Sequence, residues 1–319
     1  MSALGVIAGI TQPVLIVAGS PLLVGVLGKV RARLEGRVGA GIWQPYRDLR
    51  KLFGKEPVDP GGTSEVFRTA PLLLLATTVV VAVVAPFVAA ESAVGAAADL
   101  FAVVALLALG AVALVLGGLD TGTGFGGLGA GRRLTILALA EPTLLVAVLA
   151  LATRAGSTNL GEIVSATLDD PMRVISPGSL LAAAALVVAI VAETGRRPVD
   201  DPATGEEATM IHGATELDYA GPDLALVRLA SAMRLTVLLG LLANLFVPWG
   251  IATSDAGGAD AGTVLVGVAA LVVKVGVLGV LVAVAEVFVA RLRLVRVPEL
   301  LAGSFVLALL AVSASFFLA

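Results

Sequence analysis

The stretch ETGRRPVDDPATGEEATMIHGATELDYAG, residues 193–221, is a polar island in an otherwise apolar chain. It lies between two hydrophobic segments. Counting the flanking Glu141 and Asp223, nine carboxylates accompany only two arginines, Arg196 and Arg197. A loop of this composition indicates chemistry or the docking of another protein, so the rest of the chain is interpreted around it.

The composition on either side of this loop is that of a membrane protein. Hydrophobic residues make up 58% of the chain and charged residues 14%, and the mean hydropathy is +1.02. A helix needs roughly 20 residues to cross the hydrocarbon core of a bilayer, and apolar runs of that length recur throughout. We therefore predict an all-α, polytopic integral membrane protein formed by a single membrane domain, residues 1–319.

The apolar runs predict about eight transmembrane helices. Their approximate ranges are 3–28, 70–90, 99–118, 134–153, 179–195, 224–250, 262–288 and 299–318. The first run is not preceded by a positive segment, so it is expected to be a retained span rather than a cleaved signal.

The distribution of basic residues predicts the orientation. The loops 29–69, 119–133, 196–223 and 291–298 carry sixteen Lys and Arg residues, whereas 91–98, 154–178 and 251–261 carry two. Because cytoplasmic loops are enriched in Lys and Arg, the first set is predicted to be cytoplasmic and both termini to lie outside. The acidic loop then faces the cytoplasm.

Three loops have further features. Apolar positions at helical spacing from Ile42 to Phe53, with basic residues between them, predict an amphipathic interfacial helix or a basic segment attracted by anionic lipid. The glycines of 119–133 are expected to allow close backbone packing against a partner. The outer loop 154–178 is expected to hold a short surface helix between residues 159 and 172.

Cysteine is absent from the sequence, and the only histidine is His212. The protein therefore cannot by itself build a thiolate-ligated iron–sulfur cluster, a Cys/His zinc site or a bis-histidine haem. If it works in a redox complex, the electron carriers are on partner subunits. His212 itself is expected to be a surface histidine of a polar loop.

Ionisable residues inside apolar helices cost about 2.5 to 3.5 kcal/mol on insertion scales, so each needs a partner or a purpose. Arg228 and Glu286 are expected near the interface, with solvated head groups. Glu141, Arg234 and Lys274 are predicted to lie deeper.

Glu141 has two interpretations. It is followed by Pro142, which loosens a helix, and a buried carboxyl there can relay protons. The alternative is a structural ion pair with Arg234, which lies at comparable depth. Lys274 is interpreted either as a relay member or as a counter-ion. The predicted proton path comprises seven residues: Glu141, Glu193, Asp200, Glu206, Glu207, Arg234 and Lys274.

The sequence resembles the complex I subunit 1 family, a membrane component of NADH:quinone oxidoreductase. The resemblance rests on ETGRRPVDDP (193–202), Glu207 and ELDYAG (216–221). Further stretches resemble the branch of formate hydrogenlyase subunit 4 and hydrogenase-4 component C. They are GRVGAGIWQPYRDLRKLF (36–53), GLDTGTGFGGLGAGR (118–132), EP (141–142), AGSTNL (155–160), VPWG (247–250) and EVFVARLRL (286–294).

The resemblance implies a non-catalytic heel subunit of a group 4 [NiFe]-hydrogenase or formate hydrogenlyase-like complex in the cell membrane. Iron–sulfur clusters and the NiFe centre would be on the partner large and small subunits, and antiporter-like subunits would be neighbours in the membrane. Glu141, Glu193, Asp200 and Glu207 match the acidic channel of the family. The predicted docking positions are Arg37, Gln44, Arg47, Asp48, Asp120, Arg132 and Arg196.

The acidic loop departs from the complex I pattern at Val199, Asp201, Ala203 and Gly205, which favours the hydrogenase branch. A quinone-site subunit of a proton-pumping complex stays open as the alternative. Two other possibilities are a purely structural anchor and a stand-alone transporter that holds an anion with Arg234 and Lys274. No residue is predicted to be catalytic, and whether the protein counts as part of an enzyme depends on its complex.

Overall fold

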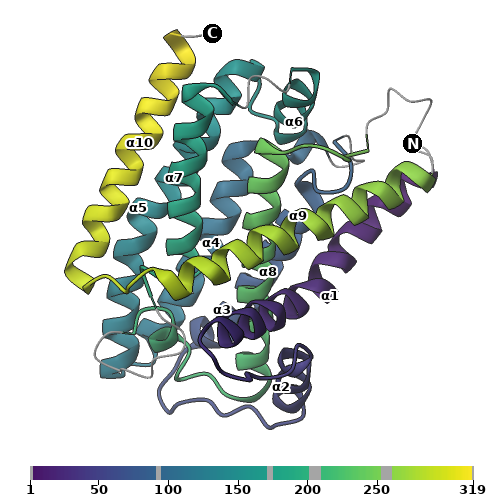
Figure 1. Cartoon of the computed structure of the whole chain (residues 1–319). Helices are drawn as coiled ribbons and strands as arrows, with labels where there is room; N and C mark the ends of the chain where they lie inside the picture. Colours follow the sequence, from purple (N-terminus) through teal and green to yellow (C-terminus); the bar gives the residue numbers. More distant parts are fainter. Residues whose placement is uncertain (1–2, 91–94, 171–174, 201–209, 253–260, 318–319) are drawn as a thin grey trace.

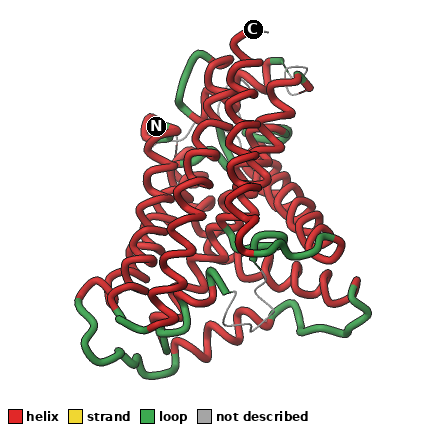
Figure 2. Tube along the Cα trace, turned by 90° about the vertical axis from the view of Figure 1, so that its left-hand side faces the viewer, coloured by secondary structure: helices red, strands yellow, loops and turns green. Residues whose placement is uncertain are grey.

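The computed structural model describes residues 3–90, 95–170, 175–200, 210–252 and 261–317. Over these residues the chain is helical, without a named β-strand (Figure 2). The long helices are α1 (Ala3–Leu34), α3 (Glu65–Val84), α4 (Leu100–Asp120), α5 (Gly124–Ala155), α8 (Gly221–Phe246), α9 (Ala261–Phe288) and α10 (Val297–Phe317). Shorter ones are α2 (Gln44–Phe53), α6 (Leu160–Asp169), α7 (Pro177–Glu193) and the 3-10 turns η1 (Gly95–Ala97), η3 (Gly213–Thr215) and η5 (Leu294–Arg296).

The eight predicted spans correspond to α1, α3, α4, α5, α7, α8, α9 and α10. Within the described residues, seven of these are long and apolar enough to cross a membrane, and α7 is an apolar helix of 17 residues. At 1.5 Å per residue α7 extends about 25 Å, less than the hydrocarbon thickness. The prediction of a polytopic all-α membrane protein is confirmed, and α7 has the length of its predicted range, 179–195, with its start two positions earlier.

Side-chain caps set the starts of five α-helices. Ser64, Asp99, Thr123, Asn159 and Ser176 each have extended backbone and accept a hydrogen bond from an amide in the first turn of α3, α4, α5, α6 and α7. Such residues satisfy amides that lack a partner within the helix. The predicted surface helix of the outer loop is therefore α6, which begins directly after Asn159.

The structure agrees with the prediction for the amphipathic segment but not with that for the glycine-rich segment. The predicted amphipathic helix is α2, whose Leu52 is buried against the bundle. The segment 119–133 was expected to be a loop, but α4 continues to Asp120 and α5 begins at Gly124. Gly129 packs within the chain, because a Cβ atom there would lie 2.5 Å from Cβ of Ala214. The physical reason is the Thr123 cap, which starts the helix early.

The helices have two directions. In Figure 1, α4, α5, α7 and α10 run alongside one another, and α1 and α9 cross the bundle obliquely as a packed pair. Helix α2 lies at the end of the bundle opposite the two termini. Both termini are in the same half of the molecule, as an even number of crossings requires.

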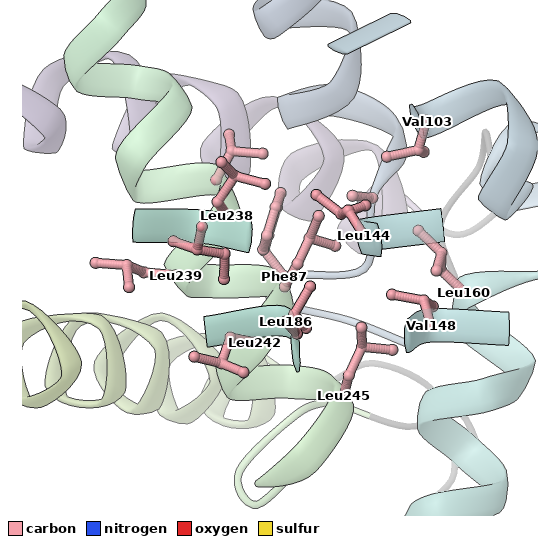
Figure 3. Close-up of a cluster of buried hydrophobic side chains, with 14 of the residues drawn as sticks. Phe87, Val103, Leu144, Val148, Leu160, Leu186, Leu238, Leu239, Leu242 and Leu245 are labelled. Atoms are coloured by element: carbon pink, nitrogen blue, oxygen red, sulfur yellow. The ribbon is translucent and has the colours of Figure 1, made fainter. Parts of the chain in front are cut away.

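The main core lies where α4, α5, α7 and α8 meet the turn after α3. Phe87 of that turn is 1% exposed and packs among leucines of the surrounding helices, among them Leu144, Leu186 and Leu238 (Figure 3). Gly240 allows this contact, since a Cβ atom there would lie 2.7 Å from the Phe87 ring. The packed core holds α5, α7 and α8 together, and these three helices carry the buried charges described next.

Candidate functional site

Arg234 of α8 joins two carboxylates from different helices. Its Nη2 lies 2.9 Å from Oε1 of Glu141 on α5 and 2.5 Å from Oε1 of Glu193 at the end of α7. Its Nη1 donates to the main-chain oxygen of Leu107 at 2.7 Å. All three charged residues are buried. The predicted ion pair between Glu141 and Arg234 is confirmed, and Glu193 shares it.

This charged trio has spare acceptor capacity. Among the described residues, neither carboxylate oxygen of Glu193 accepts a hydrogen bond of good geometry, and neither does Oε2 of Glu141. Two carboxylates and one guanidinium carry a net charge of −1 when all are ionised. Uptake of one proton by either carboxylate would make the trio neutral, and buried charge without compensation is costly. The arrangement can therefore hold and release a proton.

The acidic loop folds back under the trio. Gly195 has φ +61 and ends α7, and the chain returns so that Asp200 is 4% exposed. Oδ2 of Asp200 accepts from the amides of Ile211 and His212 at 3.3 and 3.0 Å. Oδ1 accepts from Arg291 at 3.4 Å. Asp200 thus joins the two described ends of the loop and the segment after α9.

His212 is not the solvated surface residue that the sequence suggested. Its Nδ1 lies 3.4 Å from Oδ2 of Asp200, and its Nε2 lies 3.2 Å from the main-chain oxygen of Glu193. The side chain is 16% exposed. This residue connects the Asp200 carboxylate with the end of α7, a contact between segments that loop composition does not reveal.

A cavity of about 550 Å³ opens beside these groups. Its charged lining residues are Asp48, Arg133, Glu193, Arg196, Asp200, Glu216, Arg228 and Arg234, together with His212. Apolar residues of α1, α2, α3 and α8, such as Val24 and Leu49, complete the walls. The structure therefore gathers Glu193, Asp200 and Arg234 around one space, with Glu141 directly behind Arg234.

Arg133 and Glu216 belong to this site and were not among the predicted site residues. Arg133 is 3% exposed, and its Nη1 donates to Oγ1 of Thr215 at 3.1 Å. Its Nε has no acceptor among the described residues. Burial raises the pKa of Glu216 above its ordinary value, an effect that nearby Arg133 partly opposes. An arginine within apolar residues was the available signal for Arg133, but the segment was interpreted as a loop.

Lys274 has a different environment. Its Nζ donates to Oδ1 of Asn244 at 3.3 Å, and Asn244 donates to the main-chain oxygens of Pro86 and Phe87. On the other side of this turn, the Gln12 side chain forms hydrogen bonds with four more backbone groups of the turn and of the end of α3. In the described part of the chain, Lys274 thus supports a buried polar turn and contacts none of the predicted path carboxylates. Glu206 and Glu207 lie outside the described residues.

Glu286 is buried rather than solvated as expected. It is 1% exposed, and its Oε1 lies 3.1 Å from Nη1 of Arg196, while Oε2 lies 3.8 Å from Nη1 of Arg31. Arg197 donates to the Glu286 main-chain oxygen at 3.2 Å. The end of α9 therefore binds both α1 and the acidic loop. Arg196, a predicted docking residue, makes this contact within the chain.

The other predicted docking residues lie in two groups. Asp120 accepts from the amides of Ser64 and Phe67, and Arg132 donates to the Met210 main-chain oxygen at 3.0 Å. These two residues hold loops of the same chain.

The second group lies around α2. Gln44 donates to Asp48 at 2.8 Å in the first turn of that helix, Arg47 is exposed, and Arg37 forms an ion pair with Glu35. Trp43, next to them, is 62% exposed. This group presents a mixed basic and aromatic face at the end of the bundle opposite the termini. The hydrogen bonds from Arg37 and Arg31 lower the pKa of Glu35.

Comparisons with known proteins match this chain over nearly its full length. The sequence profile of the family described as NADH dehydrogenase matches residues 6–316. Hydrogenase-4 component C of Escherichia coli (strain K12) is 35% identical over 307 residues, 96% of this chain and 94% of the relative. Formate hydrogenlyase subunit 4 of the same organism is 32% identical over 310 residues, 97% and 98% of the two chains.

Two other similarities are more distant. A subunit of the NADH-quinone oxidoreductase of Burkholderia vietnamiensis (strain G4 / LMG 22486) is 31% identical over 232 residues, 69% of this chain and 64% of the relative. A protein in the structure of a membrane-bound sulfane sulfur reductase, an archaeal respiratory membrane complex, has a TM-score of 0.83 and 22% identity, covering 98% of this chain and 99% of that protein. The last similarity shows a shared fold.

Proposed function

The chain belongs to the NADH dehydrogenase family, and from this premise we propose that it is the heel subunit of a complex I-like [NiFe]-hydrogenase or formate hydrogenlyase-type complex. In this role it anchors the peripheral hydrogenase subunits to the membrane and offers them a proton path. The two relatives that cover almost the whole chain are named as hydrogenase and formate hydrogenlyase subunits, which supports this branch. The cell membrane is the proposed location, with antiporter-like subunits as membrane neighbours.

The observation that carries the proton path is the buried trio of Glu141, Arg234 and Glu193 beside a cavity lined by Asp200. A proton that reaches the cavity can bind Glu193, whose buried carboxylate oxygens accept no hydrogen bond of good geometry within the described residues, and then pass to Glu141 across Arg234. The positive charge of Arg234 compensates the carboxylate that is still ionised. Each step moves one proton between carboxylates and requires no redox chemistry in this chain.

The other predicted path residues have different parts in the proposal. Glu206 and Glu207, which belong to the acidic loop in the sequence, would supply protons from the cytoplasmic side. Lys274 lies on α9 beside Asn244 and would act after Glu141. We place it outside the central part of the path because its described contact supports a backbone turn.

The proposed docking face is α2 with the segment before it. Arg37, Gln44, Arg47 and Asp48 lie there, next to the exposed Trp43. Mixed charge around an exposed aromatic residue is typical of protein interfaces. Asp120, Arg132 and Arg196 would act indirectly, by holding the loops behind this face.

The redox centres are proposed to lie on partner subunits. Thiolate-ligated clusters and a NiFe centre need cysteine ligands, and this chain contains none. Among the described residues there is also no cluster of His, Asp and Glu suited to a metal ion. The proposed partners are the hydrogenase large subunit and the small iron–sulfur subunit.

The first experiment measures the metals of the complex purified from native membranes through a tag on this chain, in mild detergent. Nickel together with iron is the result expected for a hydrogenase anchor. Iron without nickel would contradict that assignment and favour a quinone-linked relative of complex I. An untagged strain processed in the same way controls for adventitious metal.

The second experiment tests the proton path. Glu193→Gln and Glu141→Gln keep side-chain size and remove the titrating group, so hydrogen turnover in sealed vesicles should continue with less proton translocation per turnover. Glu299→Gln changes an exposed carboxylate of α10 and serves as the matched control. Unchanged coupling in both buried variants would show that the trio has only a structural role. The chain would then be a purely structural anchor.

A second candidate function is supported by the cavity itself. A volume of about 550 Å³ with apolar walls is in the range of small-molecule sites, which fits a quinone. Dependence of the purified complex on added quinone, and inhibition by a quinone-site ligand, would favour this alternative. Hydrogen evolution that is insensitive to both would exclude it.

The transporter interpretation has less support. It requires Arg234 and Lys274 to hold an anion together, but Arg234 already contacts two carboxylates and Lys274 donates to Asn244. Among the described contacts, none joins the two residues.

A further inference from the structure

The two ring nitrogens of His212 face two acceptors. The main-chain oxygen of Glu193, 3.2 Å from Nε2, can only accept a hydrogen bond, so Nε2 carries a proton. Nδ1 faces Oδ2 of Asp200 at 3.4 Å. A neutral ring would then point a lone pair at the carboxylate, whereas a charged ring donates to both acceptors. The geometry therefore favours a proton on Nδ1 that is directed at Oδ2.

The contacts of Asp200 place that proton on the imidazole. Its carboxylate accepts from the amides of Ile211 and His212 and from Arg291, and all three bonds stabilise the ionised form. A carboxylate with these partners is a weak base, so the neighbouring imidazole nitrogen is the better proton holder. Nδ1 of His212 is therefore the atom of this pair that would hold the proton, directed at the Asp200 carboxylate.

The ring is also accessible to the proposed path. His212 lines the same cavity as Glu193, whose carboxylate oxygens accept no good hydrogen bond within the described residues. Gly195 lies against the other side of the ring, because a Cβ atom there would be 2.6 Å from Nδ1. The ring is held between the turn and the cavity, with Nδ1 as its exchangeable position.

The charged groups around His212 come from every neighbouring segment. They are Glu193 of α7, Asp200 and Arg196 of the turn, Glu216 after η3, Arg133 of α5, Arg228 and Arg234 of α8, and Arg291 after α9. Both signs of charge line the cavity, and a proton moving from a charged His212 ring to the Glu193 carboxylate neutralises one charge of each sign.

We propose that His212 is the residue that loads protons into this cavity, from its Nδ1, which faces the Asp200 carboxylate. In the step, the Nδ1–H bond breaks, the electron pair stays on the imidazole, and the proton crosses the cavity solvent to form an O–H bond on Glu193. His212 becomes neutral and is reprotonated from the cytoplasmic side. This inference rests on the proposed function and adds the entry residue to the path.

The experiment is the pH profile of proton translocation by the intact complex in sealed vesicles, for wild type and His212→Gln. A glutamine amide can still donate to the Glu193 main-chain oxygen but has no group that titrates between about pH 5 and 8. Translocation should fall about 100-fold, the usual scale of a lost acid–base group, and one ionisation should disappear from the profile. In His212→Ala, added imidazole should restore part of the rate.

A structural role for His212 predicts a different result. Assembly and thermal stability would then fall while the remaining activity kept the wild-type pH profile and ignored imidazole, and that outcome would overturn the inference. Glu193→Gln separates this from failure of the proposed function. If Glu193→Gln abolishes translocation and His212→Gln leaves it normal, only the inference fails. If both variants translocate protons as the wild type does, the proposed proton path itself is wrong.

Discussion

Nη2 of Arg234 lies 2.5 Å from Oε1 of Glu193, and both side chains are 3% exposed. The same nitrogen contacts Glu141, so one guanidinium compensates two buried carboxylates. Removing it by Arg234→Met would leave those charges without a counter-ion. Loss of one partner of a buried pair costs about 3 to 5 kcal/mol. The expected result is a large drop in the apparent Tm of the detergent-solubilised complex.

A triple variant provides the control for this prediction. Arg234→Met combined with Glu141→Gln and Glu193→Gln has no buried charge left in the trio, so much of the lost stability should return. If Arg234→Met alone were as stable as wild type, the trio would not be the charge-compensated cluster described.

Glu286 makes a second buried cluster with Arg196 and Arg31. Glu286→Gln would leave Arg196 without its carboxylate at the junction of α1, α9 and the acidic loop, while Arg31 would keep Glu35. We expect a loss of about 3 to 5 kcal/mol and release of the loop, measured as faster proteolysis after Arg196 and a lower apparent Tm. Glu299→Gln should stay within about 0.5 kcal/mol, because Glu299 is exposed. Equal effects of the two variants would contradict the cluster.

Two glycines of α5 make a matched pair. A Cβ atom at Gly129 would lie 2.5 Å from Cβ of Ala214, whereas one at Gly131 would meet nothing within 4 Å. Gly129→Ala should push η3 and the acidic loop away from α5 at a cost of about 1 to 3 kcal/mol. Gly131→Ala should be neutral or stabilising by up to about 1 kcal/mol, since alanine favours the helix. Thermal unfolding of the two variants tests this, and equal stability would refute the close contact.

Glu216 gives a pH dependence of stability. Burial raises its pKa in the folded protein, so the folded state holds the proton more tightly than the unfolded chain. Unfolding then releases a proton, and stability falls as the pH rises from the ordinary glutamate value of 4.5 to the raised value. Glu216→Gln should remove that decline, which a series of Tm measurements against pH would show. Glu162→Gln, at an exposed position of α6, should keep the wild-type slope.

Several parts of the fold were predictable because they depend on local chemistry. Backbone groups inside a bilayer must form hydrogen bonds within their own segment, so an apolar run of sufficient length becomes a helix. Asn159 before α6 and the amphipathic spacing of α2 acted in the same local way. The spans were therefore located correctly, including the short α7, although the early start of α5 at Gly124 was missed.

The site was predictable only in part. Polar residues within apolar segments marked Glu141, Glu193 and Arg234, because ionised groups there are rare and need partners. The roles of Arg133, His212 and Glu286 were missed, since each depends on a contact with a segment far away in the chain, such as Arg133 with Thr215. Lys274, like Arg234, is a basic residue within an apolar segment, but the structure places it beside Asn244 and not at the trio.

The sequence by itself therefore determined that this protein crosses a membrane as a set of helices, with a carboxylate-rich loop between two of them and no cysteine in the chain. The tertiary structure alone decided which charges meet. Glu141 and Arg234 are 93 residues apart in the chain, and their contact depends on how α5 and α8 are rotated and packed around the core. Helix formation is governed by neighbouring residues, whereas the pairing of buried charges is governed by packing between helices.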